Sequence, residues 1–175
     1  MDVDVIDMED PAVGRDVRSR LDARRVASTK ITMYGMCNGV GQMIQDIVGV
    51  APRGGVNALR IWSHGRPGGQ TVSGGEAGEA GRVQHWTGIS VANIDALHDQ
   101  LVGLNPVFAP GARVELRGCS VAGGAPGDEL LQRLARLWGV TVQGGTVVQT
   151  GIDWIPPVHQ ASPSGAMSCT MGTNP

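Results

Sequence analysis

Residues 113–124 read Arg-Val-Glu-Leu-Arg-Gly-Cys-Ser-Val-Ala-Gly-Gly. Charged and apolar side chains alternate over the first five positions, which is the period of a β-strand, and Gly118 then permits a turn. Leucines recur at helical spacing over residues 128–138, so we expect Cys119 between a strand and a helix. A cysteine at a strand end can act as a nucleophile when a nearby histidine stabilises its thiolate. The alternative is that Cys119 is a small buried hydrophobic residue, which is the commoner fate of a free cysteine.

The composition favours one domain and argues against several kinds of partner. The chain has 175 residues and a mass of 18.2 kDa, which is enough for a single domain with a good core. A net charge of -2 and few aromatic residues provide no basic surface for nucleic acid or for an anionic membrane, so we expect neither partner. Four histidines and three cysteines lack the close ligand pairs of a zinc site, and no Walker-type or dinucleotide motif occurs. We therefore expect no metal and no cofactor.

The cysteines and the N-terminus indicate the compartment. Cys37, Cys119 and Cys169 cannot all pair with one another, and none forms a Cys-x-x-Cys motif. The chain begins with acidic residues rather than a signal peptide, and no apolar run has the length of a membrane span. We expect a reducing setting, either the cytoplasm or export without a signal peptide, as for a secretion-system effector.

Strand and helix patterns alternate along most of the chain. Residues 1–27 are charged and weakly periodic, which predicts an N-terminal arm or a short helix over residues 17–26. Residues 28–175 are expected to form a single α/β domain with a mostly parallel sheet, helices on its faces and a loop-rich tail from residue 150. The glycine-rich residues 66–82 suit a hairpin or a mobile loop. The expected strands are 30–36, 58–63, 113–117 and 140–148, and the expected helices are 43–48, 93–101 and 128–138.

Two residues of complementary chemistry follow expected strands. His64 comes directly after the second strand, and Cys119 follows the third, 55 residues later. The carboxyl ends of parallel strands meet at one edge of a sheet, where active sites form. A neutral imidazole can take the thiol proton, and an imidazolium can later protonate a leaving amine. This pattern favours a His-Cys dyad.

The same two segments resemble the caspase-like cysteine peptidases of clan CD, which include caspases, legumains and gingipains. In that superfamily an apolar strand ends in His-Gly and a later apolar strand ends in the nucleophilic cysteine, as residues 59–65 and 114–119 do here. The resemblance extends over residues 31–149. Residues 117–124 and the leucines that follow them are also similar to bacterial domains of the superfamily. It implies a three-layer sandwich with helices on both faces of the sheet, and cysteine endopeptidase activity.

The resemblance also implies roles for particular residues. The backbone amides of Gly65 and Cys119 would form an oxyanion hole, and Asn38 resembles the asparagine that legumains place beside their catalytic histidine. The caspase pattern Gln-Ala-Cys-x-Gly is absent, so aspartate specificity does not carry over. Separately from the resemblance, Asp153 follows the strand after the cysteine, where it would either charge a substrate pocket or lie in a solvated loop.

These observations lead to one main hypothesis and two alternatives. The main hypothesis is a cysteine endopeptidase with Cys119 as nucleophile, His64 as general base and acid, a protein or peptide as substrate, and a regulatory or delivery protein as a further partner. One alternative is a catalytically silent binding module on the same scaffold. The other is a hydrolase or acyltransferase that uses the dyad on a substrate other than a peptide, because fold and function are separable.

Overall fold

The structure is a computed structural model of the whole chain, and it describes residues 1–8, 11–34, 38–72 and 88–171. Its centre is a seven-stranded sheet with the strand order β10-β9-β8-β7-β3-β1-β2. The five strands from β8 to β2 are parallel to their neighbours, and β9 and β10 extend the sheet as antiparallel strands. The strands are β1 (Asp2–Asp7), β2 (Thr29–Met33), β3 (Val56–Trp62), β7 (Phe108–Leu116), β8 (Thr141–Gly145), β9 (Val158–Ala161) and β10 (Met167–Thr170).

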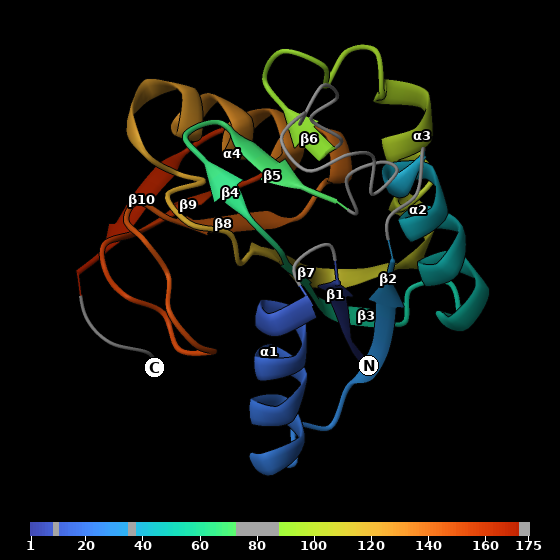
Figure 1. Cartoon of the computed structure of the whole chain (residues 1–175). Helices are drawn as coiled ribbons and strands as arrows, with labels where there is room; N and C mark the ends of the chain where they lie inside the picture. The colour runs from blue at the N-terminus through green and yellow to red at the C-terminus, as the bar shows by residue number, and fades with distance from the viewer. Residues whose placement is uncertain (9–10, 35–37, 73–87, 172–175) are drawn as a thin grey trace.

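Helices cover both faces of this sheet, as Figure 1 shows. Helix α1 (Pro11–Ala23) lies on one face, where Val17 and Leu21 pack against Ile6 and Trp62. The larger core lies on the other face beneath α2 (Gly39–Val50), α3 (His98–Val102) and α4 (Gly124–Trp138). This is the α/β class with a mostly parallel sheet and a three-layer arrangement, as the sequence predicts.

A small three-stranded antiparallel sheet stands over the carboxyl ends of the parallel strands (Figure 1). It consists of β4 (Gly65–Arg66), β5 (Gly69–Thr71) and β6 (Gly88–Ser90). The hairpin expected after His64 is therefore confirmed for β4 and β5, while residues 73–87 of the expected loop lie outside the described residues. Gly68, at the tip, has a φ of +71°, a left-handed conformation that glycine adopts without strain.

The expectation of a loose N-terminal arm is wrong, although α1 supplies a helix in that region. Strand β1 pairs with both β2 and β3, so it lies inside the sheet. Asp4 is fully buried on this strand. Its carboxylate is stabilised there because the Trp62 indole nitrogen donates to it at 2.7 Å and the Arg60 guanidinium lies 3.6 Å away. The acidic side chains at alternate positions of β1 therefore interact with residues of β3 instead of with solvent. Residues 1–27 thus belong to the same packed unit as the rest of the chain.

Two other expectations need correction. The tail from residue 150 is not without regular structure, because β9 and β10 form an antiparallel hairpin on the edge of the sheet. The helix expected over residues 93–101 is confined to α3, followed by a short 3-10 helix, η1 (Asn105–Val107). Asn93 explains the late start, because its side chain accepts the Ser90 amide and donates to the Gly88 carbonyl, and so closes a turn instead. In the described part of the chain, no helix is long and apolar enough to span a membrane.

Helix α4 follows the sequence pattern closely. Leu130, Leu131 and Leu134 are buried against the sheet, and Trp138 at the end of the helix is buried, with its indole nitrogen donating to Leu101 at 3.0 Å. Gly139 ends the helix in the left-handed conformation, with a φ of +68°. The helix begins at Gly124, shortly after Cys119, and its apolar face packs against the sheet.

Candidate active site

His64 and Cys119 follow two neighbouring strands of the central sheet. Strands β3 and β7 are parallel, with Ile61 paired to Leu116 near their ends. The Arg117 amide then donates to the Ile61 carbonyl at 2.9 Å, which continues the pairing past the last ladder residues. Both segments turn within the next few residues, so the parts of the chain that carry His64 and Cys119 leave the sheet side by side.

The backbones of these two segments are in direct contact, and glycine is required on both sides. A Cβ atom on Gly118 would lie 2.8 Å from the Gly65 Cα atom and 2.9 Å from its nitrogen. A Cβ atom on Gly65 would lie 2.8 Å from the Cys119 carbonyl oxygen. Atoms at these separations overlap, so any side chain at either position would separate the two strand ends.

The turn that carries Cys119 is constrained by contacts with the loop that follows β8 (Thr141–Gly145). Ser120 has a φ of +54°, a left-handed conformation that is uncommon for a residue with a Cβ atom. Its amide donates to the Val147 carbonyl at 2.8 Å, and the Cys119 Sγ atom donates to the Gln149 carbonyl at 3.6 Å. Cys119 itself is partly exposed. Backbone strain of this kind persists only where the surrounding structure imposes it, and it often marks functional sites.

Gln70 lies between the two strand ends and is fully buried. Its Oε1 atom accepts the Gly118 amide at 3.1 Å, and its Nε2 atom donates to Ser63 Oγ and, at 3.4 Å, to the Ile61 carbonyl. The sequence pattern does not mark this residue as part of a site. A glutamine between glycines in a loop-like segment gives no signal that its amide will be enclosed.

A charged network supports the strand that leads to Cys119. The Arg117 guanidinium stacks on Trp154 at 3.7 Å from the ring centroid and lies 5.0 Å from that of Trp62. Glu115 accepts from Arg117 Nε at 2.8 Å and from Arg113 Nε at 2.9 Å. Burial raises the pKa of Glu115, but the charge of Arg117 and the Arg113 hydrogen bond outweigh it, so this pKa lies below its ordinary value. Glu115 is therefore ionised at neutral pH, although it is 3% exposed.

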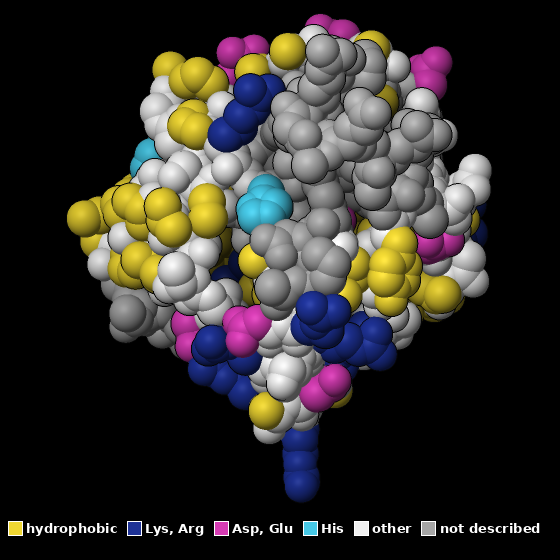
Figure 2. Space-filling model, viewed as in Figure 1, with side chains coloured by type: hydrophobic (Ala, Val, Ile, Leu, Met, Phe, Trp, Pro, Cys, Tyr) yellow, Lys and Arg dark blue, Asp and Glu magenta, His cyan; other side chains and the backbone are white. Residues whose placement is uncertain are grey.

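Asp153 borders a cavity of about 170 Å³ between α1 and the loop after β8. Arg24 donates to both oxygens of this carboxylate at 2.7 Å, and this hydrogen bond lowers the pKa of Asp153. Figure 2 shows basic and acidic side chains interspersed around α1, and Arg20 and Arg24 line the cavity beside Asp153. Asp153 is exposed at this cavity, and its role in a substrate pocket stays a prediction.

Asn38 is the N-cap of α2, where its Oδ1 atom accepts the Gly41 amide at 3.3 Å. Strand β1 lies between β2 and β3, so the end of β2 is two strands, or about 10 Å, from the end of β3. The turn chemistry of Asn38 is thus confirmed, whereas its role in orienting His64 stays a prediction. Cys37 lies outside the described residues.

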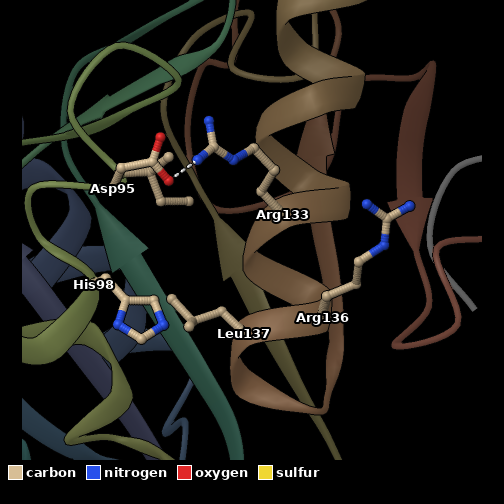
Figure 3. A pocket seen from close by; sticks show the side chains of 6 residues that line it. Asp95, His98, Arg133, Arg136 and Leu137 are labelled. Atoms are coloured by element: carbon tan, nitrogen blue, oxygen red, sulfur yellow. Dashed lines mark hydrogen bonds and ion pairs between the residues drawn. The ribbon is translucent and has the colours of Figure 1, made fainter.

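Two other histidines lie in the described part of the chain, and each interacts with a carboxylate. His98, on α3, lines a cavity of about 300 Å³ with Ile94 and Leu137, and Figure 3 shows Arg133 reaching from α4 to Asp95 above it. The second is His159 on β9, whose Nδ1 atom lies 2.6 Å from Asp128 Oδ1 and ties the edge of the sheet to α4. His85 lies outside the described residues. Among the side chains that the structure describes, no group of three or more His, Cys, Asp or Glu residues is placed to hold a metal ion.

Comparison with protein families gives a match over most of the chain. The model of a domain of unknown function, DUF4347, matches residues 21–154. The chain belongs to the DUF4347 family. In this DUF4347 protein the matched residues include both strand ends, the β4–β5 hairpin and α4, whereas β1, β9 and β10 lie outside the match. Comparisons with curated proteins and with solved structures found no match.

Proposed function

We propose that this DUF4347 protein is a cysteine endopeptidase with Cys119 as nucleophile and His64 as general base and acid. The observation that carries the proposal is the contact between Gly65 and Gly118, which brings together the two strand ends that bear the dyad residues. The resemblance of both segments to caspase-like peptidases supports the same chemistry. Two complementary side chains on touching segments at the carboxyl edge of a parallel sheet are the arrangement that thiol acylation needs.

The proposed reaction proceeds through an acyl-enzyme. The imidazole of His64 takes the thiol proton, and the Cys119 sulfur attacks the carbonyl carbon of the scissile peptide bond. The tetrahedral intermediate collapses as the imidazolium gives its proton to the leaving amine, which departs and leaves a thioester on Cys119. A water molecule then gives a proton to His64 and attacks the thioester, which releases the acid product and restores the thiol.

The hydrogen-bond pattern of the β4–β5 hairpin supports the assignment of an oxyanion donor. Thr71 donates its amide to the His64 carbonyl at 2.9 Å, so His64 and Thr71 form a hydrogen-bonded antiparallel pair. The next pair, Gly65 with Gln70, is then of the non-hydrogen-bonded type, and the Gly65 amide points away from β5. A fixed backbone donor of this kind needs no reorganisation as charge develops on the substrate oxygen. The Cys119 amide is the second proposed donor.

The chemistry proposed for the thiol supports a proposal for the compartment. Cys119 and Cys169 are free, and the proposed reaction needs Cys119 in the reduced form. A reducing compartment preserves that form. We therefore propose that the protein acts on a protein or peptide in the cytoplasm, either of its own cell or, after delivery by a secretion system, of another cell.

One observation favours the alternative of a silent binding module. The Cys119 thiol donates to the Gln149 carbonyl at 3.6 Å, which holds the sulfur atom against the loop after β8. An active enzyme must release this contact when it binds substrate. The two functions differ in their dependence on the sulfur atom, because capture of a partner does not require a nucleophile.

Replacing Cys119 by alanine is expected to abolish peptide cleavage without unfolding the domain, because the residue is partly exposed and only one atom is lost. Cleavage of a peptide library by purified protein, read by mass spectrometry, measures the loss. The matched control is Cys169→Ala, the same change at an exposed cysteine of β10, and this variant is expected to retain full activity. Activity that survives in pure Cys119→Ala protein would remove Cys119 from the mechanism. A partner captured equally well by both variants would favour the binding module.

A further inference from the structure

We infer that Gln70 is the positioning residue of the dyad, because its buried side-chain amide fastens the end of β3 to the end of β7. This inference rests on the proposed function, since it assigns to Gln70 the task of keeping His64 and Cys119 in register. Gln70 contacts neither reacting side chain through the hydrogen bonds described above. It acts on the backbone that carries them.

The amide reaches both strand ends at once. On the Cys119 side, the Oε1 atom accepts the Gly118 amide at 3.1 Å, one residue before the nucleophile. On the other side, the Nε2 atom donates to Ser63 Oγ, one residue before His64, and to the Ile61 carbonyl at 3.4 Å. The two halves of one planar group therefore set the separation between the residues that precede the dyad.

The contacts extend from Gln70 to the backbone of His64 itself. Ser63 Oγ donates to the Thr71 carbonyl, and Thr71 donates to the His64 carbonyl from its amide at 2.9 Å and from its hydroxyl at 3.0 Å. Gln70 and Thr71 are neighbours on β5, so one short strand holds the His64 segment and the Cys119 segment together. The hairpin is in turn held to the turn after Cys119, because the Gly68 amide donates to the Val121 carbonyl at 3.0 Å.

Few side chains could replace Gln70 in this place. The site requires one acceptor and one donor on the same group, and both are buried, so an unmatched group would leave polar atoms unsatisfied. A glutamate keeps the acceptor for Gly118 but presents a second acceptor to the Ile61 carbonyl. A methionine has a similar length and lacks both functions. Fully burying an amide is costly unless its hydrogen bonds are made, which is why its presence here indicates a specific role.

The test measures iodoacetamide labelling of Cys119 by mass spectrometry in the native protein, in Gln70→Met, in His64→Ala and in the double variant. Gln70→Met is expected to slow labelling at pH 7 by about tenfold, because a thiol that loses its histidine partner falls back to a thiolate fraction of a few per cent. In the double variant, labelling is expected to be no slower than in His64→Ala alone, because a residue that acts through His64 has nothing left to position. Peptide cleavage should show the same loss in kcat with KM little changed.

Gln143→Met is the matched control. Gln143 lies on β8 of the central sheet and donates from its side chain to Gln160 at 2.6 Å, so the same change removes a hydrogen-bonded amide that does not join the ends of β3 and β7. This variant is expected to label at the native rate. If Gln70→Met fails to fold, as judged by circular dichroism, Ser63→Ala replaces it, because it removes the hydroxyl that joins Gln70 to Thr71 and is expected to slow labelling by a smaller factor.

Two results would overturn the inference, and they are distinguishable from a failure of the proposed function. Labelling of Gln70→Met at the native rate, together with slow labelling in His64→Ala, leaves the dyad intact and removes Gln70 as its positioning residue. Additive losses in the double variant do the same, since they mean that Gln70 and His64 act independently. If Cys119 is labelled at the same rate in the native protein and in His64→Ala, the proposed dyad is overturned, and the positioning role of Gln70 with it.

Discussion

A Gly118→Ala variant is expected to lose about two orders of magnitude in kcat for peptide cleavage while keeping the native secondary structure. The added Cβ atom would meet the Gly65 Cα atom and Gln70 Oε1, each at 2.8 Å. Gly65 is a backbone contact and Gln70 is buried, so neither can move away cheaply. The φ of Gly118 is not in the left-handed region, so alanine brings no backbone strain and the steric overlap accounts for the effect.

The matched control is Gly49→Ala. Gly49 lies in α2, and a Cβ atom there would have no neighbour within 4 Å. Alanine is a better helix former than glycine, so this variant is expected to be more stable by roughly 0.5–1 kcal/mol and fully active. Steady-state kinetics on a cleaved peptide and urea unfolding measure the two effects. Native kcat in Gly118→Ala would mean that the contact between the strand ends has no part in catalysis.

The sequence predicted the parts of the fold that depend on local pattern. The apolar face of α4 and its glycine stop are both present, and β3 and the second half of β7 lie where alternation and turn residues indicated, although β7 begins at Phe108 instead of Arg113. These signals are local, because a helix face and a strand period repeat within a few residues. Placement of His64 and Cys119 after parallel strands followed from the same patterns.

Strand β1 was missed because its charges were interpreted as solvated. Asp2-Val3-Asp4-Val5 alternates with the period of a strand, and that signal could have identified β1. What the pattern cannot reveal is the distant partner, because Arg60 pairs with Asp2 and Trp62 donates to Asp4 from more than fifty residues away. The same limit applies to Gln70, whose role depends on three segments meeting in space.

The second large effect concerns the network below the site. Glu115→Gln is expected to lower the free energy of unfolding at pH 7 by about 3–5 kcal/mol, the usual cost of removing one partner from a buried ion pair. Glu115 is the shared acceptor of Arg113 and Arg117, and Arg60 lies 3.5 Å from it. With the carboxylate gone, the Arg117 guanidinium keeps its charge in a buried position where desolvation is no longer compensated. Urea unfolding followed by tryptophan fluorescence measures the loss, because Trp62 and Trp154 pack against Arg117.

The pH dependence of this loss identifies its cause. Although burial raises the pKa of Glu115, the arginines around it lower the pKa further, to below its ordinary value of 4.5. A carboxyl group with a lowered pKa stabilises the fold fully above its unfolded pKa, and this contribution is lost as the pH falls through the folded pKa. The difference between native protein and Glu115→Gln should therefore be largest near neutral pH and should narrow as acid protonates Glu115. Glu129→Gln, the same change on an exposed carboxylate of α4, should behave as the native protein at every pH. A difference that stays constant with pH would mean that lost packing, rather than the charge of Glu115, destabilises the variant.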